Sequence, residues 1–200
     1  MAKKVEVIIE VSARHVHLSE AHMHKLFGNR HIPCIMKPLS QPGQYASCDT
    51  IAIKGPKGEI DDVRVLGPCR EKTQVEISGT DARHLGIKPV IKLSSDHQGT
   101  PGLTLIGKKG RVHLDSGVIV AERHLHISDR KAKELGLEHG QRVKIDVNGV
   151  RDLIFESVPV RVNPNYRLSF HIDTDEANAA WVQSGDTGTL VRYKKRKKKK

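Results

Sequence analysis

Residues 11–19, with the sequence VSARHVHLS, decide the fold because the stretch recurs at residues 120–128 as VAERHLHIS. Five of the nine positions are identical, and two more exchange one aliphatic residue for another. Side chains two positions apart in a β-strand point to the same face, so both imidazoles of each His-x-His pair would project together. That arrangement suits a metal ion. A strand with two ordinary buried histidines would explain a single copy, but the repetition favours metal binding.

The composition indicates a β-rich protein with tight turns. The chain has 200 residues, of which 37% are hydrophobic, and its 17 glycines and 9 prolines separate many short apolar runs. No apolar run approaches the roughly 20 residues that a membrane-spanning helix needs. We therefore expect no association with a membrane.

The positive charge of the chain is concentrated at its C-terminus. The net charge is +11, but residues 194–200, KKRKKKK, supply seven positive charges. The rest of the chain is mildly basic, which is compatible with an anionic small-molecule substrate. We expect residues 192–200 to form a disordered basic tail. We expect no specific binding of nucleic acid, because no recognition module or interleaved aromatic residues accompany the charge.

The three cysteines, Cys34, Cys48 and Cys69, are odd in number and well separated, and they form no Cys-x-x-Cys motif. Reduced thiols in a cytoplasmic protein are the simplest interpretation. The chain runs straight into a strand pattern at about Val5, without a signal peptide or a targeting helix before it.

Periodicity and turn residues predict short strands with a few short helices between them. We expect strands at residues 5–18, 50–54, 60–66, 73–78, 117–127, 142–147, 153–162, 167–172 and near 189–192. Serine caps and terminating glycines predict helices at residues 20–27 and 128–135, with shorter ones at 81–85 and from about residue 175. Residues 88–110 have the composition of a polar connector.

The duplication extends beyond the His-x-His stretch. Residues 75–82, VEISGTDA, match residues 170–177, FHIDTDEA, and a one-residue gap that aligns the Thr-Asp pairs places Glu76 opposite His171. Each half then offers three candidate metal ligands: His15, His17 and Glu76 in the first, and His124, His126 and His171 in the second. Three ligands with an open position are typical of catalytic zinc. The all-histidine set suits Zn²⁺, and the set with a carboxylate would also accept another divalent ion.

A duplicated unit of short strands predicts a mainly β fold, with two internally duplicated small β-barrel domains capped by short helices. The chemistry is expected where the barrels meet.

Four stretches resemble the phosphate propanoyltransferase family, the phosphotransacylase associated with bacterial propanediol-utilising microcompartments. They are residues 11–19, residues 67–78 (GPCREKTQVEIS), residues 123–126 (RHLH) and residues 171–179 (HIDTDEANA). The match runs in the same order from about residue 5 to residue 191. The resemblance implies reversible transfer of a short acyl group, propanoyl or acetyl, between CoA and phosphate. It also implies two β-barrel domains, an active site with two zinc ions at their junction, and a homodimer.

The resemblance also implies roles for single residues. The six candidate ligands would hold two Zn²⁺ ions per chain, and Arg70 would bind phosphate as a catalytic residue. CoA would contact Ser12, Lys37, Arg64, Leu66, His171 and Asn178. Because the barrels of the family interleave, the expected domains are residues 14–121 and residues 1–13 with 122–191.

Three features depart from the family pattern. Microcompartment members carry an N-terminal encapsulation helix, and only about four residues precede the first expected strand here, so we expect a cytoplasmic form outside a microcompartment. Ala180, Trp181 and Val182 stand where glycine and leucine are expected. The lysine-rich end is not part of the pattern.

The expected chemistry is direct attack of phosphate on the thioester of acyl-CoA, without an acyl-enzyme. No Ser-His-Asp constellation is visible, and no cysteine lies in an activating motif. Two alternatives are a zinc-dependent hydrolase of an acyl or phosphate ester and a non-catalytic binding or shell-associated protein. Propanoyl and acetyl groups differ by one methylene, worth only about 1 kcal/mol in a pocket, so the sequence does not choose between them.

Overall fold

The computed structural model describes residues 5–191, which form fifteen strands and four short helices. The predicted basic tail at residues 192–200 lies outside the described residues. Within residues 5–191, no helix has both the length and the apolar character to cross a membrane.

The described chain divides into two compact units. Residues 5–11 and 123–191 form one, here called the barrel unit, and residues 12–122 form the other, here called the open-sheet unit. Each has a hydrophobic core of its own. The domain bounds expected from the sequence, residues 14–121 and residues 1–13 with 122–191, remain a prediction.

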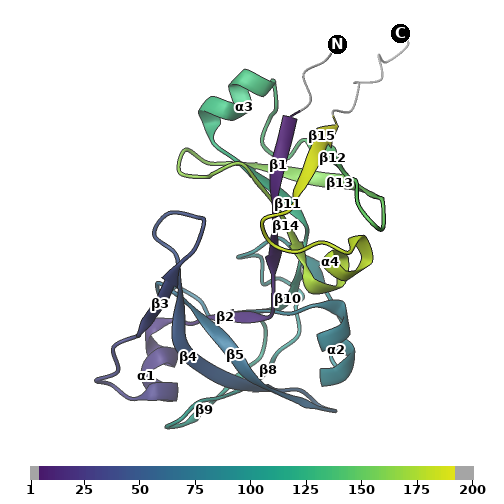
Figure 1. The fold of residues 1–200 in the computed structure, drawn as a ribbon. Helices are drawn as coiled ribbons and strands as arrows, with labels where there is room; N and C mark the ends of the chain where they lie inside the picture. The colour runs from purple at the N-terminus through teal and green to yellow at the C-terminus, as the bar shows by residue number, and fades with distance from the viewer. Residues whose placement is uncertain (1–4, 192–200) are drawn as a thin grey trace. The chain divides into compact units, whose positions relative to one another are not determined.

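Six strands of the barrel unit close into a ring. Their order around it is β1 (Val5–Ser12), β14 (Ser169–Asp173), β11 (His124–Ile127), β13 (Leu153–Val162), β12 (Arg142–Val147) and β15 (Thr187–Val191). β15 pairs with β1 and closes the barrel. The helices α3 (Asp129–Leu135) and α4 (Thr174–Ala180) lie at opposite ends of this unit (Figure 1). Fully buried side chains such as Phe170 and Ile145 fill its interior.

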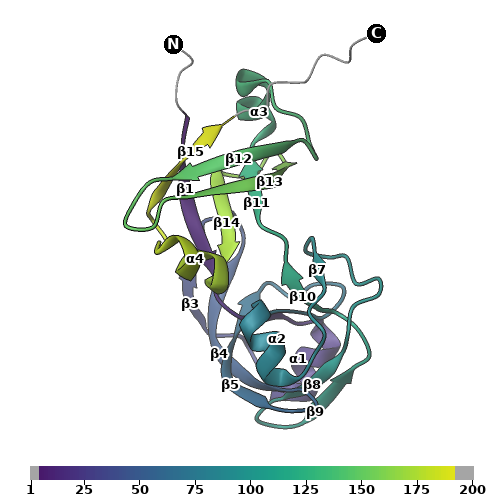
Figure 2. The ribbon, with the colours of Figure 1, turned by 90° about the vertical axis from the view of Figure 1, so that its right-hand side faces the viewer.

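The open-sheet unit contains nine strands, and no pairing among the described residues closes its sheet into a ring. The strand order is β7 (Ile91–Lys92), β10 (Val118–Ala121), β6 (Gln74–Glu76), β2 (His15–His17), β5 (Glu59–Gly67), β4 (Tyr45–Lys54), β8 (Leu103–Ile106) and β9 (Arg111–Leu114), with β3 (Ile35–Pro38) paired to β4. The helices α1 (Glu20–Phe27) and α2 (Gly79–Leu85) bury Leu26 and Leu85 in its core. Figure 2 shows the sheet curving around both helices.

The predicted fold class is confirmed: the chain is mainly β, in two barrel-like units with short helices. One barrel is closed and the other is open. The internal duplication is visible in the order of elements. In each unit, the His-x-His strand is followed by a helix (β2–α1 and β11–α3), and the strand of the third candidate ligand is followed by another (β6–α2 and β14–α4).

Two predicted long strands are wrong, because each is broken in two. Residues 5–18 form β1 and β2, and residues 117–127 form β10 and β11. Both breaks fall at the two residues before the His-x-His pair, close to the unit boundaries after Val11 and after Glu122. An alternating pattern shows that a stretch is extended, but it does not show which sheet each part joins.

The predicted ends of α1 and α3 are confirmed, whereas α2 begins at Gly79, two residues before the predicted start. The hydroxyl groups of Ser19 and Ser128 accept hydrogen bonds from the backbone of the first turn of α1 and α3. α3 ends at Gly136 in the left-handed region (φ 60°), a conformation that glycine adopts without steric penalty.

The prediction of three reduced cysteines is wrong for two of them. Cys34 and Cys48 form a disulfide, with their Cα atoms 5.2 Å apart, and only Cys69 is free. The antiparallel pairing of β3 with β4 brings the two cysteines together. Their spacing in the sequence carries no sign of that pairing, because β3 lies within residues 32–47, whose prolines and glycines are typical of a turn-rich loop.

Candidate metal centres and their surroundings

Strand register gathers each set of candidate ligands in the same way. In the open-sheet unit, β2 pairs antiparallel with β6, and His15 lies directly opposite Glu76. In the barrel unit, β11 pairs antiparallel with β14, and His124 lies directly opposite His171. Opposite residues of paired strands project to the same face. The predicted equivalence of Glu76 and His171 is therefore confirmed at the level of strand pairing.

The first group consists of His15, His17 and Glu76, whose potential ligand atoms all lie within 4.8 Å of one another. Nε2 of His15 is 3.5 Å from Oε2 of Glu76. The two imidazole centroids are 5.1 Å apart, with the rings nearly perpendicular at 89°. All three residues are buried, with exposed fractions of 3–8%. Two imidazole nitrogens and one carboxylate oxygen thus converge in a protected place.

The tautomer of His15 follows from its partners. Its Nδ1 lies 2.8 Å from the carbonyl oxygen of Ala13. A carbonyl only accepts hydrogen bonds, so Nδ1 carries a proton and Nε2, which faces Glu76, is the nitrogen available to a metal. Histidines that bind metals commonly donate their other ring N–H to a backbone carbonyl in this way.

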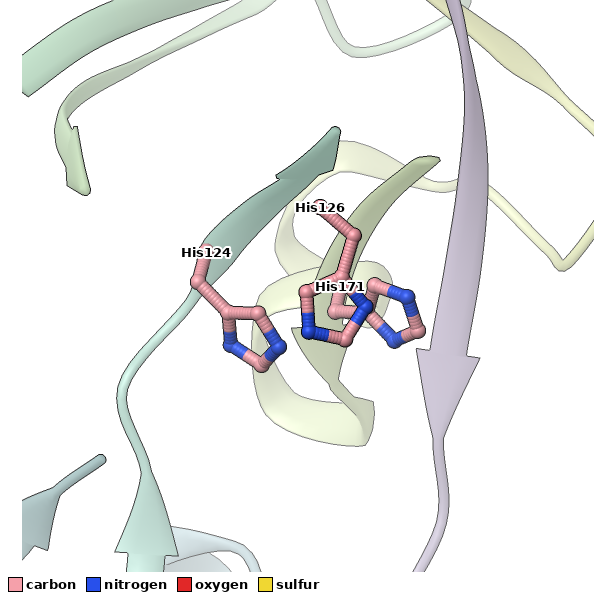
Figure 3. A group of neighbouring side chains, drawn as sticks. All are labelled: His124, His126 and His171. Atoms are coloured by element: carbon pink, nitrogen blue, oxygen red, sulfur yellow. The ribbon is translucent and has the colours of Figure 1, made fainter. Parts of the chain in front are cut away.

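The second group consists of His124, His126 and His171, which also place their potential ligand atoms within 4.8 Å of one another. Figure 3 shows the three rings projecting from β11 and β14 and gathered close together. The ring centroids are 4.4–5.0 Å apart, and the rings of His124 and His171 are parallel within 1°. Tyr166 stacks on His126 with centroids 3.9 Å apart. This packing fixes the ring of His126 in place.

Burial keeps three of the imidazoles, those of His17, His126 and His171, in the neutral form that a metal requires. Burial, with smaller effects from the charges of His15 and Arg70, lowers the pKa of His17 to about 2. Burial and then Arg161 lower the pKa of His171 to about 4. The pKa of His126 also lies far below its ordinary value, mainly through burial. At neutral pH, these rings therefore carry a free lone pair.

Several ring nitrogens are buried without a hydrogen-bond partner among the described residues. They are Nδ1 of His17 and both ring nitrogens of His126. Buried polar atoms are nearly always satisfied, because an unpaired one loses its hydration without compensation. A metal ion bound by each group would satisfy one nitrogen of each of these rings, so the residues fit a metal.

The arginine that precedes each His-x-His pair forms a structural ion pair. Arg14 contacts Asp81 at 2.7 Å, and Arg123 contacts Glu176 at 2.6 Å. Both carboxylates belong to capping boxes at the N-termini of α2 and α4. Each arginine therefore links the start of its histidine strand to the helix that follows the third candidate ligand.

Arg70, the predicted phosphate-binding residue, is connected to the first group. Its backbone N–H donates to the carbonyl of Leu18, just after β2. Its Nη1 donates to Oγ of Ser94 at 3.1 Å, and that hydroxyl donates to Oε1 of Glu76 at 2.9 Å. One serine thus separates the guanidinium from the carboxylate of the candidate metal group.

Ser94 is a site residue that the sequence did not indicate. It lies in the stretch of residues 88–110 expected to be a connector, between β7 and β8. The only signal was a run of polar residues, SSDHQ at 94–98, which is equally typical of a solvated loop. The role of Ser94 follows only from its contacts with Arg70 and Glu76, which are distant from it in the sequence.

Two residues expected to contact CoA lie beside the first group. β5 pairs in parallel with β2, which places Arg64 next to His15 and Leu66 next to His17. Nη1 of Arg64 donates to the backbone carbonyls of Ser47 and Cys48 at 3.1 and 3.0 Å.

The other residues expected to contact CoA come from several elements. Lys37 is exposed on β3, and Ser12 is partly buried at the end of β1. Asn178 is exposed on α4, which directly follows the strand of His171. Their contacts with CoA remain predictions.

Trp181, in the stretch where glycine and leucine were expected, occupies a backbone conformation that favours glycine. It caps the C-terminus of α4 in the left-handed region, with φ 57° and ψ 47°. Glycine adopts this conformation freely, whereas a residue with a side chain does so at a cost of roughly 1–2 kcal/mol. The exposed indole carries Arg151 above its ring at 5.4 Å.

Comparison with known proteins shows the family of this chain. A family model described as phosphate propanoyltransferase matches residues 8–183. The phosphate propanoyltransferase of Sebaldella termitidis is 49% identical over 188 residues, which cover 94% of this chain and 89% of that protein. That of Thermotoga maritima is 46% identical, covering 96% and 92% of the two chains. That of Citrobacter rodentium is 52% identical, covering 90% and 87%.

The protein is an acyltransferase, built as a mainly β chain with two duplicated groups of candidate metal ligands. It belongs to the phosphate propanoyltransferase family.

Proposed function

We propose that this protein is a metal-assisted phosphotransacylase that moves a short acyl group, propanoyl or acetyl, reversibly between CoA and phosphate. The observation that carries the proposal is the link from Arg70 through Ser94 to Glu76, a ligand candidate in the first group. It joins a guanidinium suited to binding anions with a set of candidate metal ligands within one unit. Family membership supports the same reaction.

In the forward direction, an oxygen of phosphate attacks the carbonyl carbon of the thioester. The carbon–sulfur bond then breaks, and the products are acyl phosphate and the thiolate of CoA. Arg70 is suited to hold the attacking phosphate, because its guanidinium is permanently charged and presents a planar set of donors. The hydrogen bond to Ser94 and the backbone bond to Leu18 fix its position.

We propose that each group holds one Zn²⁺ ion, so that the chain binds two. His15, His17 and Glu76 would hold one, and His124, His126 and His171 would hold the other, each leaving a position open. When bound, zinc would supply Lewis-acid stabilisation of an oxyanion or a resting place for the thiolate of CoA. The neutral imidazoles and the unpaired ring nitrogens support this assignment.

Direct transfer without an acyl-enzyme is supported by the state of Cys69. It is the only free cysteine among the described residues, and it directly precedes Arg70. Desolvation and then the carboxylate of Glu20 raise its pKa, so it remains a protonated thiol at neutral pH. A thiol in that state is a poor nucleophile.

The test is the release of CoA thiol from propanoyl-CoA by the zinc-loaded protein, with and without phosphate. We expect thiol release only with phosphate, together with an equal amount of propanoyl phosphate. Without phosphate, the intact mass of the protein should stay unchanged after exposure to propanoyl-CoA. Thiol release without phosphate would instead indicate a hydrolase, and a mass increase by one propanoyl group would contradict direct transfer.

A further inference from the structure

Gln74 occupies a central position beside the first group. It lies on β6 two residues before Glu76, so both side chains project to the same face. In the register with β2 it stands directly opposite His17. Its exposed fraction is 1%. A buried amide at this place must find partners for two donors and two acceptor sites.

The structure satisfies the amide of Gln74 completely. Its Oε1 accepts from the backbone N–H of Ser95 at 2.7 Å and lies 3.2 Å from Nε2 of His97. Its Nε2 lies 2.6 Å from Oε1 of Glu76 and 2.9 Å from Oγ of Ser94. The backbone N–H of Ser95 can only donate, so the atom facing it must be the amide oxygen. Nε2 is therefore the donor to Glu76.

The carboxylate of Glu76 consequently has two different oxygens. Oε1 accepts from Nε2 of Gln74 and from the hydroxyl of Ser94. Oε2 faces Nε2 of His15 at 3.5 Å. Because Oε1 already accepts two hydrogen bonds, Oε2 is the oxygen that faces the imidazoles.

We propose that Gln74 is a positioning residue that, together with Ser94, holds Glu76 as a one-oxygen metal ligand and ties residues 94–97 to the metal group. The proposal rests on the proposed function only in taking Glu76 as a ligand. Because Ser94 also accepts from Arg70, the same amide aligns the candidate phosphate-binding residue with the metal.

The barrel unit supports this assignment through the equivalent position. Ser169 lies two residues before His171 and directly opposite His126, as Gln74 lies opposite His17. Its exposed fraction is 2%, and its Oγ lies 2.9 Å from Nε2 of His171. In both halves, the residue two positions before the third candidate ligand contacts that ligand. The short serine reaches an imidazole, and the longer glutamine reaches a carboxylate.

Zinc affinity of the first group tests the proposal in the full chain. A His171→Ala background removes one ligand of the second group and leaves the first complete. In this background, Gln74→Met keeps the volume of the side chain and removes all its hydrogen bonds. We expect zinc to bind the first group 10–100-fold more weakly, as is typical when the partner of a ligand is lost. With Co²⁺ in place of zinc, the visible absorption bands should change, because both oxygens of Glu76 become available.

Matched variants separate positioning from a general loss of structure. In a Glu76→Ala background, where only the second group remains complete, Gln74→Met should leave zinc affinity unchanged. Gln98→Met, at an exposed residue of the polar run 94–98, should leave the zinc affinity of both groups unchanged. Ser94→Ala removes one donor to Glu76 from a partly buried position and should weaken zinc at the first group by a smaller factor.

The proposal is overturned if Gln74→Met leaves first-group affinity within twofold and the Co²⁺ spectrum unchanged. It is also overturned if Ser94→Ala leaves the first group unchanged, a result that counts even where Gln74→Met fails to fold. A first group that binds no metal with Gln74 intact would contradict the metal assignment of the proposed function as well. The two failures are therefore distinguishable.

Discussion

At the scale of single residues, the two groups differ mainly in the third candidate ligand. Glu76 has partners that orient one carboxylate oxygen, while His171 is oriented through an imidazole nitrogen. Within the open-sheet unit, Arg70 is linked through Ser94 to Glu76. This link supports the proposal that the first group handles the anionic substrate.

Arg14 provides a test of stability at the residue scale. Its partner Asp81 is 4% exposed, so the Arg14→Ala variant leaves a buried carboxylate without its cation. We expect a loss of about 1–2 kcal/mol in the free energy of unfolding at neutral pH, because half of the arginine side chain is already in solvent. Denaturant unfolding measures this loss. As a control, Arg83→Ala, at an exposed arginine on α2, the helix of Asp81, should change the free energy of unfolding by less than about 0.5 kcal/mol.

The loss of stability in Arg14→Ala should become smaller as the pH falls. Burial alone would raise the pKa of Asp81, but hydrogen bonds from Arg14 and Ser78 hold it below its ordinary value of 3.8. A depressed pKa stabilises the folded state above that value, and the stabilisation disappears as the pH falls through the folded pKa. The difference between wild type and Arg14→Ala should therefore shrink below about pH 4. A difference that grows on acidification would contradict this account.

At the scale of elements, the C-terminus of α4 carries a strained cap. Trp181→Gly relieves the left-handed conformation but removes the contact with Arg151. We expect a net gain of about 0.5–1 kcal/mol in the free energy of unfolding, because the strain exceeds an exposed cation–π contact. Thermal unfolding measures the change, and Arg151→Ala isolates the contribution of the cation. A Trp181→Gly variant less stable than Arg151→Ala would show that the indole contributes more than its strain costs.

Sequence patterns predicted the positions of strands and helices better than the pairing and contacts between them. The repeated His-x-His and the Thr-Asp alignment located both groups of candidate ligands, because strand periodicity fixes which side chains share a face. The breaks before His15 and His124 were invisible, because alternation continues across them while the chain changes sheets. The Cys34–Cys48 pair, Gln74 and Ser94 depend on contacts between segments distant in the sequence, and local pattern does not encode those.

At the scale of the whole molecule, the two units differ in whether their core residues come from one continuous segment of the chain. Every member of the buried core of the open-sheet unit lies between Val16 and Val118. The barrel unit depends on β1, because Val7 and Ile9 are buried in its core with exposed fractions of 1% and 0%. The predicted domains thus have different requirements for folding.

Fragments of the chain test this difference. We expect residues 12–122 alone to unfold cooperatively by circular dichroism and to bind one metal ion, because their core is complete. Residues 123–191 alone should lack cooperative unfolding, because β1 between β14 and β15 is missing. A cooperatively folded 123–191 fragment, or a 12–122 fragment without fixed structure, would contradict the predicted domains. The expected homodimer is a separate prediction, which light scattering on the full chain would check.

The central claim is that the chain carries a duplicated metal centre whose halves differ in one ligand. The most direct measurement is the number of zinc ions per chain after saturation and removal of excess metal, for the wild type, Glu76→Ala and His171→Ala. The account predicts two ions in the wild type and one in each variant, with the remaining ion unaffected. A wild type without bound zinc, or variants that still hold two ions, would contradict it.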